Sequence, residues 1–173
     1  MESRTIPIES DSLVDLNVRS DVAVIFCQDP RIRSCHKLLI RQGLGLGEKD
    51  EEYVQLPVLG GGAVLAHPQY FASEFDLIRT SLEVMREHFG VSRLVSIGHE
   101  RCLRMSNFHL QIDREPNPDS ALADMLTVRR MFEERSALSQ CPVRKMFAEF
   151  EIRLDVILMK FPTGNELKYL VID

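Results

Sequence analysis

Two cysteines and a histidine occupy positions from which they could bind one metal ion. His99 and Cys102 are separated by two residues, whereas Cys27 lies far upstream. Thiolate and imidazole are the ligands that zinc prefers, and three protein ligands leave a fourth position open for chemistry. A structural zinc knuckle normally has two close ligand pairs. One close pair joined by a distant cysteine therefore favours an open, three-ligand site.

An acidic and a basic residue follow Cys27 in the sequence Cys27-Gln-Asp29-Pro-Arg31. Alternation along an extended segment would place Asp29 and Arg31 on the same side. A carboxylate bound by arginine has its charge held in place, and it could accept a hydrogen bond from a zinc-bound water. Zinc lowers the pKa of such a water to about 7, so hydroxide would be available at neutral pH. A purely structural ion pair between Asp29 and Arg31 remains the alternative.

The elements that must position these residues are short apolar runs alternating with helical patterns. Residues 22–26 and 93–98 predict buried strands that end at the two motifs. Further strands are expected at 53–58, 154–161 and 166–172, with helices at 34–44, 74–89 and 121–134 and turns at 114–120 and 162–165. This order predicts an α/β fold, a single-domain and mostly parallel sheet with flanking helices and a C-terminal antiparallel edge hairpin.

The carboxyl ends of parallel strands are where ligands bind in such sheets. That rule places Cys27, Asp29, Arg31, His99 and Cys102 around one crevice. The run Gly60-Gly61-Gly62 follows the strand at 53–58 and lacks the patterns of phosphate-binding loops. We therefore expect close backbone approach at these glycines, and we assign Gly60, Gly61 and Gly62 to the substrate pocket.

Composition limits the class of protein. The chain has 173 residues, 45% of them hydrophobic, and a net charge of -5, which argues against a nucleic-acid partner. No apolar run reaches the ~18 residues of a membrane helix, and the N-terminus lacks a signal-peptide core, so a cytoplasmic protein is expected. Residues 1–20 predict a polar N-terminal arm, and residues 21–173 a single zinc-binding domain.

The spacing of the remaining cysteines and histidines predicts no catalytic role for them. Disulfides are disfavoured without an export signal; Cys141 is interpreted as a small buried apolar residue, and the role of Cys35 stays open. His36 and His67 are expected to be loop or surface histidines, because no ligand spacing places them in the site. The helical stripe Phe75, Leu82, Met85 and Phe89 is expected in the core.

These motifs resemble those of the β-class carbonic anhydrase family, over roughly residues 21 to 104. The family combines Cys-x-Asp-x-Arg, a glycine pair after the second strand and Gly-His-x-x-Cys after the third. The chain is most similar to a small branch of putative carbonic anhydrases, through Cys27–Arg31, Leu59–Ala63 and His99–Leu103.

The resemblance implies a site and a reaction. Cys27, His99 and Cys102 would be zinc ligands, with Asp29 and Arg31 as the orienting dyad. Zinc-bound hydroxide would attack carbon dioxide to give bicarbonate, which makes the protein a lyase. The resemblance also implies a homodimer or higher homo-oligomer with active sites near the subunit interface.

Two residues depart from the pattern of the branch. Leu103 replaces a glycine and could crowd the metal loop, and Arg101 replaces an acidic residue. Both favour an alternative, a catalytically silent zinc-binding paralogue that serves as a bicarbonate or anion sensor or as an assembly module. A hydrolase of a related linear electrophile, such as carbonyl sulfide or carbon disulfide, is a further alternative. A thiol-regulated protein using Cys27, Cys35 and Cys102 would leave the dyad unexplained.

Overall fold

The fold is built on one five-stranded sheet. The computed structural model describes residues 20–46, 53–112, 118–160 and 167–172. Within them the strand order is β2-β1-β3-β4-β5, with β1 to β4 parallel and β5 antiparallel to β4. The strands are β1 Val22–Cys27, β2 Val54–Val58, β3 Arg93–His99, β4 Arg153–Met159 and β5 Tyr169–Ile172. This architecture confirms the predicted α/β class, including the antiparallel edge.

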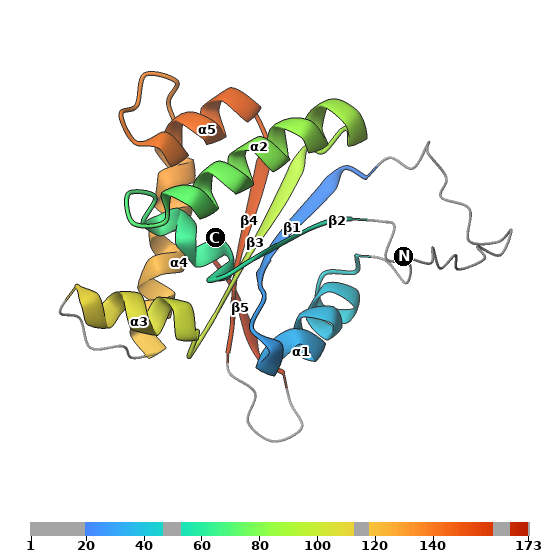
Figure 1. Ribbon diagram of the computed structural model, residues 1–173. Helices are drawn as coiled ribbons and strands as arrows, with labels where there is room; N and C mark the ends of the chain where they lie inside the picture. Colours follow the sequence, from blue (N-terminus) through green and yellow to red (C-terminus); the bar gives the residue numbers. More distant parts are fainter. Residues whose placement is uncertain (1–19, 47–52, 113–117, 161–166, 173) are drawn as a thin grey trace, which may run out of the picture.

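Helices cover both faces of the sheet (Figure 1). The chain moves from β1 to β2 in one direction and from β2 to β3 and β4 in the other. Right-handed crossovers therefore place α1 on one face and the later helices on the opposite face. The helical elements are η2 Pro30–Ile32, α1 Arg33–Leu38, η3 Leu39–Gly43, η4 Gly61–Ala66, α2 Ala72–Phe89, α3 Leu103–Gln111, α4 Pro118–Glu133 and α5 Pro142–Phe150.

The two central strands, β1 and β3, flank the point where the chain changes direction across the sheet. They pair in parallel with Ile25 opposite Ser96. Both read as continuous apolar runs because both faces are covered, and Ile25, Leu94 and Ile97 are fully buried. Loops that leave a sheet at such a switch point diverge and open a crevice. The crevice lies beyond Cys27 and His99, the last residues of β1 and β3.

Several boundaries differ from the sequence-based expectation. α2 ends before Gly90, which has the left-handed conformation, as expected, but Phe89 is the last residue of the helix and is 40% exposed, so the expectation that it lies in the core was wrong. α4 begins at Pro118, so 118–120 are helical rather than part of a turn, and 114–117 lie outside the described residues. α3 and α5 were not expected.

Two expected segments are not described. The arm at 1–19 and the turn at 162–165 lie outside the described residues. β5 begins at Tyr169, so the final strand is shorter than the expected 166–172. No helix among the described residues combines the length and apolar character needed to cross a membrane.

Candidate metal centre

Cys27, His99 and Cys102 converge beyond the ends of the two central strands. Cys27 ends β1, His99 ends β3, and Cys102 is the N-cap residue of α3. One ligand atom from each side chain lies within 4.8 Å of the other two, and all three residues are buried. The two sulfur atoms are 3.8 Å apart. The arrangement could hold a metal ion.

The geometry of the three side chains fits a tetrahedral zinc ion. Zn–S bonds of about 2.3 Å at a tetrahedral angle separate two sulfur atoms by about 3.8 Å, so the thiols already stand at the required distance. His99 Nδ1–H donates to the carbonyl oxygen of Glu100 at 2.8 Å, which leaves a lone pair on Nε2. That Nε2 is buried without a hydrogen-bond partner among the described residues. Metal-binding histidines are typically oriented in this way.

The thiols of Cys27 and Cys102 form a hydrogen-bonded pair. The pKa of Cys27 is lowered, chiefly because the Cys102 thiol donates a hydrogen bond to its sulfur, and His99 adds to the effect. The Gly60 N–H also donates to this sulfur, at 3.4 Å. The pKa of Cys102 is raised by the same hydrogen bond and by burial. The pair therefore supplies one thiolate readily, and a bound cation would displace the second proton.

Asp29 and Arg31 form the ion pair expected from their spacing. Arg31 Nε–H donates to Asp29 Oδ1 at 2.9 Å, and Nη2–H donates to Oδ2 at 2.5 Å. The backbone N–H of Arg31 also donates to Oδ1, at 3.0 Å, so Asp29 caps the turn that begins at Pro30. The hydrogen-bonded guanidinium lowers the pKa of Asp29. The carboxylate is therefore held ionised and oriented.

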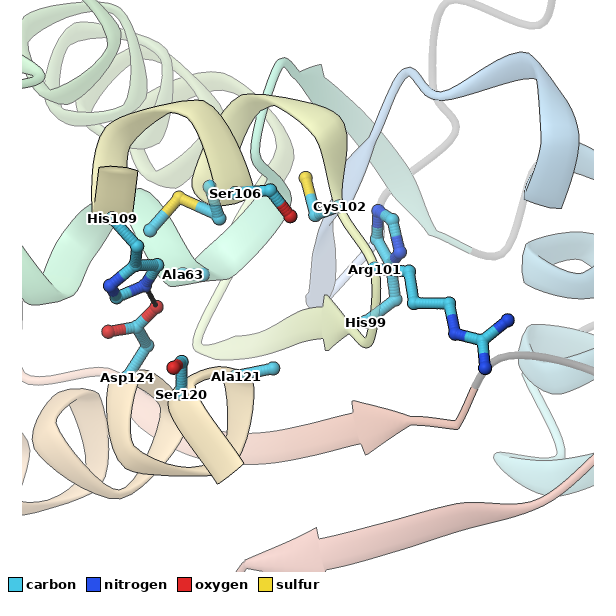
Figure 2. Close-up of a pocket in the computed structure, with 10 residues that line it drawn as sticks. Ala63, His99, Arg101, Cys102, Ser106, His109, Ser120, Ala121 and Asp124 are labelled. Carbon is cyan, nitrogen blue, oxygen red and sulfur yellow. Dashed lines mark hydrogen bonds and ion pairs between the residues drawn. The ribbon is translucent and has the colours of Figure 1, made fainter. Parts of the chain in front are cut away.

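Arg31 also connects the two motif loops. Its Nη2 donates a hydrogen bond to the carbonyl oxygen of Arg101 at 2.9 Å. Arg101 has a φ of 54°, in the left-handed region. Its guanidinium extends away from Cys102 (Figure 2). Leu103 is 59% exposed and faces solvent, so it does not crowd the metal loop.

The three glycines bring η4 into contact with β1 and β3. A Cβ on Gly61 would lie 2.6 Å from the carbonyl oxygen of Ile97 and 2.9 Å from the nitrogen of Cys27. A Cβ on Gly62 would lie 2.0 Å from Ser96 Oγ. The expected close backbone approach is therefore present. None of the three glycines lines a described cavity at the site, and their assignment to the substrate pocket stays a prediction.

Two cavities adjoin the metal-binding cluster. The first has a volume of about 270 Å³ and opens beside His99 and Cys102 (Figure 2). Its lining also includes Ala63, Arg101, Met105, Ser106, His109, Ser120, Ala121 and Asp124. The second, of about 420 Å³, lies beside Cys27 and is lined by His36 among others.

His36 lies elsewhere than its spacing suggested, whereas His67 lies in a loop, as expected. His36 belongs to α1 and is 2% exposed, so the expectation of a surface residue was wrong. It packs between Phe26 and His99, with ring centroids 5.2 and 6.2 Å away. Burial and the nearby His99 lower the pKa of His36 to about 4. His67 and His109 both hydrogen-bond to Asp124.

One sequence signal could have drawn attention to His109. It follows Cys102 by seven residues, which is two helical turns, so the two residues face the same side once α3 is recognised. His67 and Asp124 come from other elements and carry no such signal. No protein-family model matches this sequence, and no curated protein sequence matches it significantly.

Proposed function

We propose that this protein is a zinc-dependent, carbonic anhydrase-like lyase that interconverts carbon dioxide and bicarbonate. The observation that carries the proposal is the combination of two neighbouring groups. Three buried ligand side chains fit one zinc ion, and the Asp29–Arg31 pair follows one of those ligands by two residues. Metal binding alone would need no ionised, oriented carboxylate at this place.

Each residue has a distinct task in this proposal. Cys27, His99 and Cys102 would hold zinc, which when bound lowers the pKa of a coordinated water so that a nucleophile exists near neutral pH. Asp29 would accept a hydrogen bond from the reacting water. Oδ1 already accepts two hydrogen bonds from Arg31, from its backbone N–H and its Nε–H, so the water would be accepted by Oδ2, whose main donor is Arg31 Nη2–H. Arg31 would keep the carboxylate ionised and the two motif loops in register.

The cavity beside His99 and Cys102 is suited to a small neutral substrate. Its volume of about 270 Å³ exceeds what a triatomic molecule needs, and Ala63, Met105 and Ala121 give it apolar walls. Carbon dioxide has no hydrogen to donate, and apolar walls do not penalise it. Carbonyl sulfide and carbon disulfide share these properties, so they are the alternative substrates of the same proposal.

Stopped-flow hydration of carbon dioxide by the zinc-loaded protein tests the proposal. The wild type is expected to accelerate hydration above the buffer rate between pH 6 and pH 9. Asp29→Asn should retain zinc and lose most of this rate, whereas Cys27→Ser should lose zinc. Cys35→Ser is the matched cysteine control, because Cys35 is outside the cluster, and it should behave as wild type.

The result also separates the alternatives. Retained zinc with no hydration above buffer would sink the carbonic anhydrase proposal and leave a silent paralogue that binds an anion, or a hydrolase active on carbonyl sulfide or carbon disulfide. The exposure of Leu103 removes one of the two features that favoured the silent paralogue.

A homodimer or higher homo-oligomer is part of the proposal. β5 forms an edge of the sheet and exposes Leu170 and Val171 at 39% and 56%. Apolar edge strands of this kind are normally covered by another chain or protected. Cytoplasmic residence is also proposed, because a reduced Cys27–Cys102 pair suits a reducing compartment.

A further inference from the structure

A second cluster of metal-binding side chains lies at the far end of the cavity from His99. His67 Nε2–H donates to Asp124 Oδ1 at 2.8 Å, and His109 Nε2–H donates to Asp124 Oδ2 at 2.9 Å. One ligand atom from each residue lies within 4.8 Å of the other two. Figure 2 shows His109 and Asp124 pointing toward each other across the cavity from His99 and Arg101.

Three separate elements bring these side chains together. His67 is the C-cap residue of η4, His109 lies in the last turn of α3, and Asp124 lies in α4. His109 and Asp124 are each 3% exposed at the side chain, and His67 is 15% exposed. The cluster is therefore built into the core rather than gathered on the surface.

We propose that His67, His109 and Asp124 bind a second divalent transition-metal ion. Two imidazoles and one carboxylate are a ligand set that zinc and iron(II) accept, with positions left open for other ligands. Metal–ligand bonds of about 2.0–2.1 Å at a tetrahedral angle place ligand atoms about 3.3 Å apart. His67 Nε2 lies 2.8 Å from Asp124 Oδ1 and His109 Nε2 lies 2.9 Å from Oδ2, so the cluster would have to open slightly to admit an ion.

The charge of the cluster supports a cation. Among the described residues, the hydrogen-bond partners of the Asp124 carboxylate are these two imidazoles, and no lysine or arginine side chain pairs with it. A buried carboxylate is costly unless it is paired with a cation or coordinates a metal. Binding through Nε2 would require each imidazole to carry its ring proton on Nδ1, and His109 Nδ1 is buried without a partner within the described part of the chain.

The second site shares its cavity with the first. His99 and Cys102 line one end, and His109 and Asp124 line the other. Both sites would therefore open onto the same cavity of about 270 Å³. The sites share no ligand, and each can be tested when the other has been removed.

Cobalt(II) titration of the metal-free protein tests the second site. Thiolate-to-cobalt charge transfer in the near ultraviolet reports the cysteine site alone, because the second cluster contains no sulfur. The wild type should bind two cobalt ions per chain. Asp124→Asn should bind one and keep the charge-transfer band, whereas the Cys27→Ser, Cys102→Ser double variant should bind one without the band.

Matched variants keep the test decisive. His88→Gln changes an exposed histidine and should still bind two ions. If Asp124→Asn loses its far-ultraviolet circular dichroism, His67→Gln replaces it, because His67 is the least buried ligand and lies in a loop. One cobalt ion per wild-type chain, or two in folded Asp124→Asn or His67→Gln, would overturn the second site. Loss of the charge-transfer band alone would instead count against the proposed function.

Discussion

Gly61 offers the sharpest test of how the backbone builds the metal site. It has a φ of 60° and is buried against the backbone of both central strands. In Gly61→Ala the left-handed conformation costs roughly 1–2 kcal/mol. The new Cβ would also stand 2.6 Å from the carbonyl oxygen of Ile97 and 2.9 Å from the nitrogen of Cys27. Overpacking of this kind adds about 1–3 kcal/mol, so the expected loss of stability is about 2–5 kcal/mol.

Gly45 provides a matched control. It also has a φ of 60°, but no described atom lies within 4 Å of a Cβ added there. Gly45→Ala should therefore cost only the conformational part, about 1–2 kcal/mol. The difference between the two variants isolates the contact of η4 with the strands.

Zinc affinity should depend on the contact of η4 with the strands, and not only on the loss of stability. The clash can be relieved only if η4 moves away from β1, which would pull the Gly60 N–H away from Cys27 Sγ, its acceptor at 3.4 Å. Outer-shell hydrogen bonds to metal ligands are typically worth 10–100-fold in affinity. Zinc binding should weaken by about that factor in Gly61→Ala and stay unchanged in Gly45→Ala.

Two measurements decide the outcome. Urea unfolding of the metal-free variants gives the free energies, and competition with a chromogenic chelator gives the zinc affinities. Equal losses of stability in the two variants, or zinc binding by Gly61→Ala as tight as that of the wild type, would refute the role of the η4 contact in building the site.

Three further perturbations follow from the same structure. Glu151 has a φ of 52° at the end of α5, so Glu151→Gly should stabilise the protein by about 1 kcal/mol and raise Tm by roughly 2–4 °C; an unchanged Tm would contradict this. Because the pKa of His36 falls to about 4 on folding, the unfolded chain binds more protons between pH 6.5 and pH 4. The metal-free protein should therefore lose up to about 3 kcal/mol over that interval. His36→Phe should flatten this dependence in urea titrations, and an unaltered slope would count against it, whereas His88→Gln should leave the dependence as it is. Arg31→Lys cannot form the two-pronged contact with Asp29, so zinc should be retained in chelator competition while the hydration rate falls, as in Asp29→Asn; a wild-type rate would show that the dyad does not support the reaction.

The sheet and the first site could be predicted from sequence because local signals agreed with the topology. β1 and β3 are apolar runs buried on both faces, and each ends at a motif. The rule for parallel sheets then brings Cys27 and His99 together without knowledge of any contact. The ion pair of Asp29 and Arg31 depends only on residues two apart.

Of the two unexpected helices, α5 carries a helical pattern in its sequence and α3 does not. In α5 the buried residues Val143, Met146, Phe147 and Phe150 follow helical spacing, so the pattern was present in the sequence. In α3 the spacing is obscured, because Leu103 and Leu110 are exposed while the polar His109 is buried. Tertiary packing, not local pattern, decides which face of α3 is covered.

The second cluster could not be predicted from spacing. His67, His109 and Asp124 come from three elements, and their meeting depends on how α3 and α4 pack against η4. His36 is a similar case, because its burial beside His99 depends on the packing of α1 under the motif loops. Both depend on contacts between elements distant in sequence.

Removal of the metal should leave the fold intact, because the site is held by backbone contacts and an ion pair rather than by the ion. Gly61 packs against the backbone of both central strands, and Arg31 donates a hydrogen bond to the carbonyl oxygen of Arg101 across the motif loops. A zinc finger, by contrast, is unfolded without its ion. Saturation at 1,000 times Kd should add about 4 kcal/mol by mass action and raise Tm by roughly 8–16 °C. Thermal unfolding after chelation should therefore remain cooperative, with the far-ultraviolet circular dichroism retained at 25 °C. Loss of that signal on chelation would mean that the ion, and not the strands and glycines, brings the two motifs together.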